Sequence, residues 1–131
     1  MSDEEVECLG RWLEDVGFAA TKDAVDEESF GNVLLEFQRA DVCVRIACDR
    51  GDWLLTVRSA TSDWADMGLW VACLDGVRAP LTLTAFHDEV LSLRERVDEI
   101  EQRALDVDLA DCLRKQGRTR TVELIKRMRR H

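Results

Sequence analysis

Apolar residues recur at alternating spacings of three and four between residues 83 and 107. The repeat has eight members: Leu83, Phe86, Val90, Leu93, Val97, Ile100, Ala104 and Val107. This heptad spacing predicts a long helix with a narrow apolar seam, and the charged residues beside the seam would pair with opposite signs in a parallel coiled coil. Four residues of the seam form a candidate dimerisation surface: Val90, Leu93, Val97 and Ile100.

A second apolar stripe runs beside this seam. It consists of Leu91, Leu105 and Leu109, and a stripe of that combined width is typical of a helix that covers a sheet within its own chain. The heptad pattern therefore leaves two alternatives open. Either the seam belongs to the core of the chain, or it binds a second copy or a partner helix.

Apolar and polar residues alternate in three runs upstream of the heptad pattern, at residues 33–39, 42–49 and 53–59. Alternation at period two predicts strands that bury one face each. The intervening segments are short enough for hairpin turns, the second with Gly51 free to take a positive φ, so the runs predict an antiparallel meander. Residues 77–83, which include the single proline, are either a short fourth strand at the sheet edge or a crossing loop.

A first helix is expected ahead of the meander. It begins at a capping box of Ser2 and Glu5, carries apolar residues at helical spacing and ends at Gly17. Residues 19–29 have no clear period and are rich in polar side chains, so we expect them to form a loop.

Further helices are expected after the meander. A short one has its cap at Ser62 or Asp63 and its stop at Gly76. The end of the chain predicts two more short helices, separated by a break at Gly117, over residues 108–115 and 121–130.

These patterns together predict an α+β fold. Its three- to four-stranded antiparallel meander is packed by the N-terminal helix and by the long heptad-patterned helix. The length of 131 residues fits a single domain. We place that α+β domain at residues 1–113 and a basic helical tail at residues 114–131.

Charge is distributed unevenly along the chain. Residues 114–131 contain eight Lys or Arg residues and one acidic residue, a local charge of +7; because the whole chain carries −9, the preceding 113 residues carry −16. Such an acidic body repels nucleic acids and anionic membranes and attracts basic proteins. The basic tail could contact a polyanion, its own acidic body or an acidic partner.

Side chains suited to catalysis are sparse. The chain has two histidines and no tyrosine, and it lacks a nucleophile elbow, a phosphate-binding glycine loop and a distinct pair of carboxylates. His87 falls at the solvent-facing rim of the heptad helix. We therefore expect no enzymatic activity and no cofactor.

The cysteines are odd in number, scattered and surrounded by apolar residues: Cys8, Cys43, Cys48, Cys73 and Cys112. We expect them to be reduced core residues. Cys43 and Cys48 would lie on opposite faces of one strand, which argues against a shared metal ion. The acidic amino terminus and the absence of a long apolar run predict a cytoplasmic protein with no signal peptide and no membrane span.

The order of a helix, an antiparallel meander and a Trp-bearing helix resembles that of small bacterial immunity-type proteins. Two stretches of the meander carry the likeness: Val44-Arg45-Ile46 and Asp49-Arg50-Gly51-Asp52-Trp53. This resemblance implies stoichiometric binding of another protein, without catalysis. A 15 kDa acidic α+β chain that ends in amphipathic helices is also similar to class I type III secretion chaperones, which implies a dimer that holds an extended segment of another protein.

The sequence thus favours a non-enzymatic module that binds a basic partner protein in an immunity-like or chaperone-like manner. Its candidate contact residues combine acids with large aromatic anchors: Asp63, Trp64, Asp66 and Trp70. The alternative is a dimeric regulator that associates with nucleic acid. In that case basic residues of the tail would contact phosphates: Arg118, Arg120, Arg127, Arg129 and Arg130.

Overall fold

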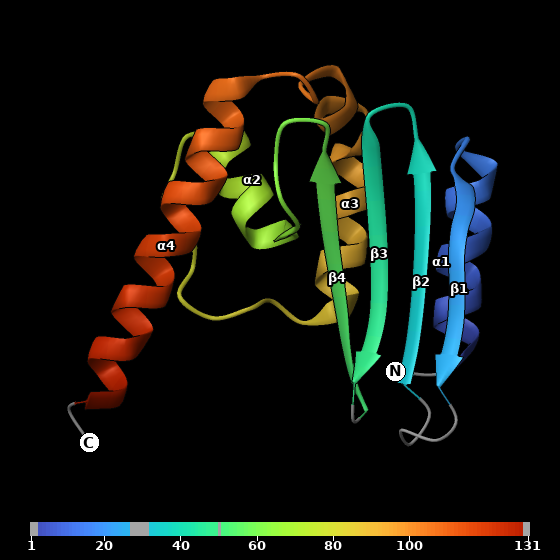
Figure 1. The fold of residues 1–131 in the computed structure, drawn as a ribbon, viewed down its shortest axis with the longest axis horizontal. Helices are drawn as coiled ribbons and strands as arrows, with labels where there is room; N and C mark the ends of the chain where they lie inside the picture. Colours follow the sequence, from blue (N-terminus) through green and yellow to red (C-terminus); the bar gives the residue numbers. More distant parts are fainter. Residues whose placement is uncertain (1–2, 27–31, 50, 130–131) are drawn as a thin grey trace.

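The computed structural model describes residues 3–26, 32–49 and 51–129. These residues form an α+β fold with a five-stranded antiparallel sheet and four helices (Figure 1). The elements follow one another as α1 (Asp3–Asp15), β1 (Ala19–Asp26), β2 (Asn32–Arg39), β3 (Val42–Asp49), β4 (Asp52–Ser59), β5 (Ala65–Asp66), α2 (Met67–Asp75), α3 (Phe86–Gln102) and α4 (Val107–Arg129).

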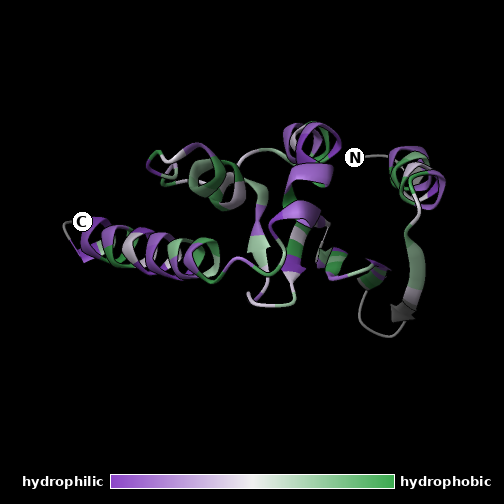
Figure 2. Ribbon diagram, turned by 90° about the horizontal axis from the view of Figure 1, so that it is seen from above, coloured by the Kyte–Doolittle hydropathy of each residue, from purple (hydrophilic) through white to green (hydrophobic). Residues whose placement is uncertain are grey.

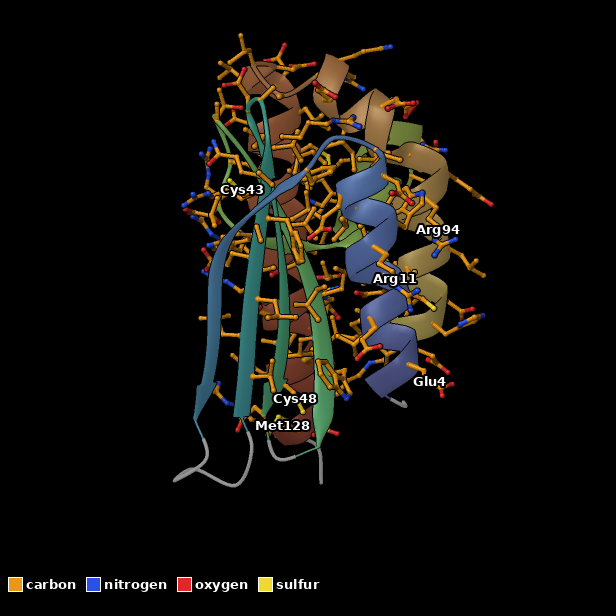
Figure 3. The ribbon with its side chains drawn as sticks, turned by 90° about the vertical axis from the view of Figure 1, so that its right-hand side faces the viewer. Glu4, Arg11, Cys43, Cys48, Arg94 and Met128 are labelled. Atoms are coloured by element: carbon orange, nitrogen blue, oxygen red, sulfur yellow. A yellow bond between two sulfur atoms is a disulfide. The ribbon has the colours of Figure 1, made fainter. Side chains whose placement is uncertain are left out.

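The sheet is a meander in which each strand pairs with the next one along the chain, in the order β1-β2-β3-β4-β5. The predicted antiparallel meander is confirmed, with strand bounds that differ from the sequence pattern by at most one residue. The alternation has the expected effect, because Val44, Ile46 and Val57 are fully buried on one face. Helices α1 and α3 lie on that face (Figure 3).

The loop expected at residues 19–29 was wrong for residues 19–26, which form a strand, and residues 27–29 lie outside the described part of the chain. β1 pairs with β2 from Ala19↔Gln38 to Asp26↔Asn32, with one register shift between Ala20 and Lys22. Pairing to β2 satisfies backbone groups of this polar segment, which side-chain periodicity alone does not indicate. The capping residue Ser2 lies outside the described part of the chain.

The strand suggested for residues 77–83 is absent, and this segment is the crossing loop. The sheet is extended beyond β4 by β5 instead, which directly precedes α2. Helix α2 therefore begins later than expected: its cap is Asp66, whose Oδ2 accepts a hydrogen bond from the backbone N–H of Leu69 at 3.4 Å. The expected stop at Gly76 is confirmed, with φ of 69°.

The heptad repeat does not form one helix. α3 ends at Gln102 and α4 starts at Val107, because Asp106 caps the new helix by accepting a hydrogen bond from the N–H of Leu109 at 3.1 Å. Leu83 precedes α3 and is more than half exposed.

The candidate dimerisation seam lies mostly inside the single chain. Leu93, Val97 and Ile100 are buried in the hydrophobic core, and Val90 packs against it at the rim. The structure therefore corresponds to the intramolecular alternative, and these three residues are not on a surface that a second copy could reach.

Helix α4 continues through Gly117, where a break was expected. A glycine inside a helix costs only about 1 kcal/mol relative to alanine. The helix contacts α2 at this position, where a Cβ on residue 117 would make an ordinary 3.6 Å contact with Cδ1 of Leu69. The tail assigned to residues 114–131 is thus, as far as Arg129, the continuation of a 23-residue helix whose first half belongs to the body.

A disulfide bond joins α2 to α4. It links Cys73 and Cys112, whose Cα atoms are 5.9 Å apart, and corrects the expectation that all five cysteines are reduced. Spacing in sequence could not reveal this pair, because the bond spans 39 residues and depends on helix packing. Cys43 and Cys48 do not pair with each other.

The disulfide gives a simple chemical prediction. Titration of the denatured, unreduced protein with a thiol reagent should detect three thiols, those of Cys8, Cys43 and Cys48, and reduction should raise the number to five. Mass spectrometry of the alkylated protein checks which cysteines react. Five reactive thiols before reduction, in protein purified without reductant, would contradict the bond.

Candidate functional site

The four predicted contact residues do not form one exposed surface. Trp70 is fully buried, and its indole N–H donates a hydrogen bond to the backbone oxygen of Val57 at 3.1 Å. Asp66 is also buried, and only Asp63 is well exposed. Trp70 and Asp66 therefore stabilise the fold and are not available to a docked protein, which corrects that part of the prediction.

Trp64 lies on the sheet face opposite the core. The guanidinium of Arg45 stacks over its ring at 3.9 Å from the centroid, and that of Arg58 at 4.9 Å. Arg45 also pairs with Glu36 on the neighbouring strand at 3.2 Å. These cation–π contacts hold the indole half-buried against two arginines. The contacts that Trp64 was expected to make with a partner protein are therefore partly made by the protein's own side chains.

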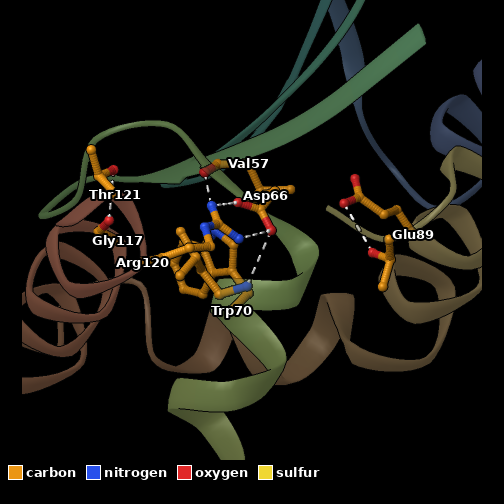
Figure 4. A network of polar contacts seen from close by, with 9 residues as sticks. Val57, Asp66, Trp70, Glu89, Gly117, Arg120 and Thr121 are labelled. Atoms are coloured by element: carbon orange, nitrogen blue, oxygen red, sulfur yellow. Dashed lines mark hydrogen bonds and ion pairs between the residues drawn. The ribbon is translucent and has the colours of Figure 1, made fainter. Parts of the chain in front are cut away.

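A buried polar network occupies the junction of α2, α3 and α4 (Figure 4). Arg120 of α4 donates two hydrogen bonds to the carboxylate of Asp66, at 2.5 and 3.2 Å. Their side chains are 14% and 8% exposed. This bidentate pair connects α4 to the start of α2, and it removes Arg120 from the set of arginines that could contact nucleic acid.

Glu89 of α3 is buried close to this ion pair. Thr84 Oγ1 donates a hydrogen bond to its Oε1 at 3.1 Å. Burial, and to a lesser extent the negative charge of Asp66, raises the pKa of Glu89 to about 7. A buried carboxyl with such a pKa is a recognised marker of functional sites, but here Glu89 belongs to the packing between three helices.

The exposed arginines predicted for phosphate contact are spread along α4. Arg118, Arg127 and Arg129 are exposed, and Arg130 lies outside the described residues. Of the five arginines expected to contact phosphates, the described part of the chain therefore leaves three on the surface.

The sequence patterns did not indicate a groove between α1 and α3. It has a volume of about 400 Å³ and is lined by Glu4, Glu5, Cys8, Phe86, His87, Val90, Leu91 and Arg94. Its apolar wall comes from α3, where Leu91 is 47% exposed and Phe86 and Val90 are half-buried. Figure 3 shows the two helices beside each other on one face of the sheet.

Helix α1 supplies the two acids of the groove, Glu4 and Glu5, and α3 supplies one cation, Arg94. Helix α1 as a whole contains six acidic residues and one arginine, Arg11. Arg94 of α3 lies over the ring of Trp12 at 5.2 Å from its centroid, which fixes this cation at the junction of the two helices. An apolar wall beside an acidic helix suits the apolar face and the basic flanks of an amphipathic helix.

The groove could have been suspected from two residues only. Leu91 lies outside the heptad seam, and Cys8 lies off the apolar face of the first helix. Both are exposed in the structure. The groove itself depends on two helices about 80 residues apart in sequence, which no local pattern brings together.

The fold and the groove define an acidic α+β protein with a groove between two helices. Comparison of the chain with protein-family models, with curated proteins and with solved structures found no match. The resemblance to immunity-type proteins and secretion chaperones therefore stays a prediction. No helix in the described residues has the length and apolarity needed to cross a membrane, and these residues contain no cluster of three or more side chains suited to holding a metal ion.

Proposed function

We propose that the protein is a non-enzymatic binding module whose groove between α1 and α3 receives a basic amphipathic helix of a partner protein. The groove is the observation that carries this proposal, because it combines exposed apolar side chains with an acidic wall. Binding of this kind is stoichiometric, in the manner of an immunity protein or a chaperone, and requires neither a cofactor nor a catalytic residue.

Charge supports this choice of partner. The 113 residues before Arg114 carry −16, so a basic protein is attracted over a distance before it docks. The groove then offers an apolar surface made by Phe86, Val90 and Leu91. A partner helix can pack its own apolar residues, spaced at i, i+3 or i+4, against this surface.

Binding should depend on Leu91 in a test with a defined probe. The probe is a 14-residue peptide of leucine and lysine, with the leucines at helical spacing, titrated by calorimetry into the full chain at physiological salt. Leu91→Glu should weaken binding at least about tenfold, because it places a charge on the apolar wall. Leu91 is 47% exposed, so this substitution leaves the fold intact.

Leu105→Glu is the matched control. It makes the same change of side chain at a position that is 67% exposed and lies between α3 and α4, outside the groove. If Leu91→Glu binds the peptide as tightly as Leu105→Glu does, the attraction is general electrostatics, which an added negative charge does not weaken, and the groove is not the site. Failure of the unmodified protein to bind the peptide would also overturn the proposal.

The nucleic-acid alternative has weaker support. Arg118, Arg127 and Arg129 are available to phosphates, but Arg120 is committed to Asp66. A regulator of this kind would bind a generic duplex with an affinity that falls steeply as salt rises. The same calorimetric titration with a short DNA duplex separates the two functions, and we expect no binding.

A further inference from the structure

The carboxy-terminal end of α4 extends away from the body of the protein (Figure 1). The first part of the helix is held by the Cys73–Cys112 bond and by the Asp66–Arg120 ion pair. Beyond Arg120 the helix continues through Arg129, and Figure 1 shows this end pointing away from the sheet and the other helices. We call residues 121–129 the projecting end.

The projecting end is amphipathic. Its four large apolar side chains are Val122, Leu124, Ile125 and Met128, with exposures of 44, 38, 43 and 75%. At about 100° per residue they share roughly one half of the helix circumference. Figure 2 shows the resulting alternation of hydrophobic and hydrophilic segments along α4. Apolar residues gathered in this way on a helix that leaves the body are typical of an interaction surface.

The charge of the projecting end matches the groove. Lys126 pairs with the single acid, Glu123, at 3.7 Å, which leaves Arg127 and Arg129 as the excess cations. The lining of the groove has the opposite balance, with the acids Glu4 and Glu5 and one arginine, Arg94. The groove also offers the apolar wall of Phe86, Val90 and Leu91. The projecting end thus has the chemistry that the groove requires: exposed apolar residues flanked by cations.

A single chain cannot bring these two surfaces together. Figure 1 places α1 at one end of the molecule and the projecting end of α4 at the other. The disulfide and the buried ion pair fix the first half of α4 to α2, so the helix cannot swing back across the sheet. The matching groove that the projecting end can reach is therefore that of another copy.

We infer that the projecting end of α4 docks in the α1–α3 groove of a second copy of the chain. This inference rests on the proposed function of the groove as a receptor for a basic helix. When two copies exchange their projecting ends around a two-fold axis, the contact forms twice and the assembly closes as a dimer. The interface overlaps the heptad seam suggested by the sequence only at its half-buried rim, Phe86 and Val90, and leaves the buried part of the seam in the core.

The test is the solution mass of the full chain by light scattering over a concentration series. Wild type should be a dimer, and both Ile125→Glu, on the projecting end, and Leu91→Glu, in the groove, should be monomers. Circular dichroism should show that both variants remain folded, because each replaced side chain is nearly half exposed. Leu105→Glu should remain a dimer.

Mixing the two monomeric variants gives a result that misfolding cannot produce. Ile125→Glu retains an intact groove and Leu91→Glu retains an intact projecting end, so an equimolar mixture can form one of the two contacts. The mean mass of the mixture should rise above that of either variant alone. No rise on mixing, at concentrations where wild type is fully dimeric, would overturn the inference.

Failure of the inference can be told apart from failure of the proposed function. A wild-type protein that is monomeric at every concentration, or a dimer that neither variant disrupts, excludes the tail-to-groove contact. If that monomer still binds the leucine–lysine peptide and Leu91→Glu weakens the binding, the groove serves a different protein. If the peptide does not bind either, both proposals are wrong.

Discussion

Replacing Arg120 by methionine should lower the free energy of unfolding by about 3–5 kcal/mol, because removing one partner of a buried ion pair leaves the other charge without compensation. Asp66 is only 8% exposed and receives both hydrogen bonds of the guanidinium. Methionine keeps most of the apolar volume of the arginine stem. Chemical denaturation followed by tryptophan fluorescence measures the effect.

The matched control is Arg118→Met, which makes the same change two residues earlier on α4. Arg118 is exposed, so its replacement should change stability by less than about 0.5 kcal/mol. The double variant Asp66→Asn, Arg120→Met should be more stable than the sum of the two single changes predicts, since neither site then holds an unpaired charge. Additive losses would show that the ion pair does not couple α4 to α2.

This ion pair also explains why the sequence misassigned Asp66 and Arg120. Each residue has a reasonable role when read locally: an acid beside an aromatic anchor, and a cation in a basic tail. They are 54 residues apart, and only the packing of α4 on α2 brings them together. A surface role was therefore predicted for two side chains that the fold uses internally.

Local patterns were sufficient for the centre of the fold. The alternation in residues 33–59 predicted three strands and their antiparallel pairing, because each strand buries one face and short turns fix the register. β1 was not predicted because apolar and polar residue types do not alternate clearly along residues 19–26 of the sequence. The strand is defined by its backbone pairing with β2.

The heptad pattern was informative about burial and misleading about length. It identified Leu93, Val97 and Ile100, which lie in the core. It also included Leu83 and Val107, which lie outside α3 and are exposed. A heptad repeat records which residues can face one side of a helix, but it does not show that a new helix begins at a capping residue such as Asp106.

Replacing Glu89 by glutamine should stabilise the protein at high pH. Burial raises the pKa of Glu89 from 4.5 to about 7. In the unfolded chain the group has an ordinary pKa, so between pH 4.5 and 7 the folded state holds a proton that the unfolded state releases. The contribution of Glu89 to stability is therefore most favourable below pH 4.5 and is lost as pH rises through 7.

The size of the effect follows from the same values. A pKa raised from 4.5 to about 7 corresponds to about 3 kcal/mol of lost stability when the carboxyl is ionised in both states. Glutamine is neutral at every pH and its side-chain oxygen can still accept the hydrogen bond from Thr84. The stability difference between Glu89→Gln and wild type should thus grow from near zero at pH 4.5 to about 3 kcal/mol at pH 8.

Urea denaturation of both proteins across this pH range measures the difference, and Glu95→Gln provides the control. Glu95 is exposed on the same helix, so its replacement removes the same charge without relieving burial, and its effect should be small at every pH. Because the Asp66 charge raises the pKa of Glu89, Asp66→Asn should move the pH dependence to lower pH. A stability difference for Glu89→Gln that stays constant from pH 4.5 to 8 would mean that this carboxyl has the same pKa in the folded and unfolded states, so that burial does not raise it.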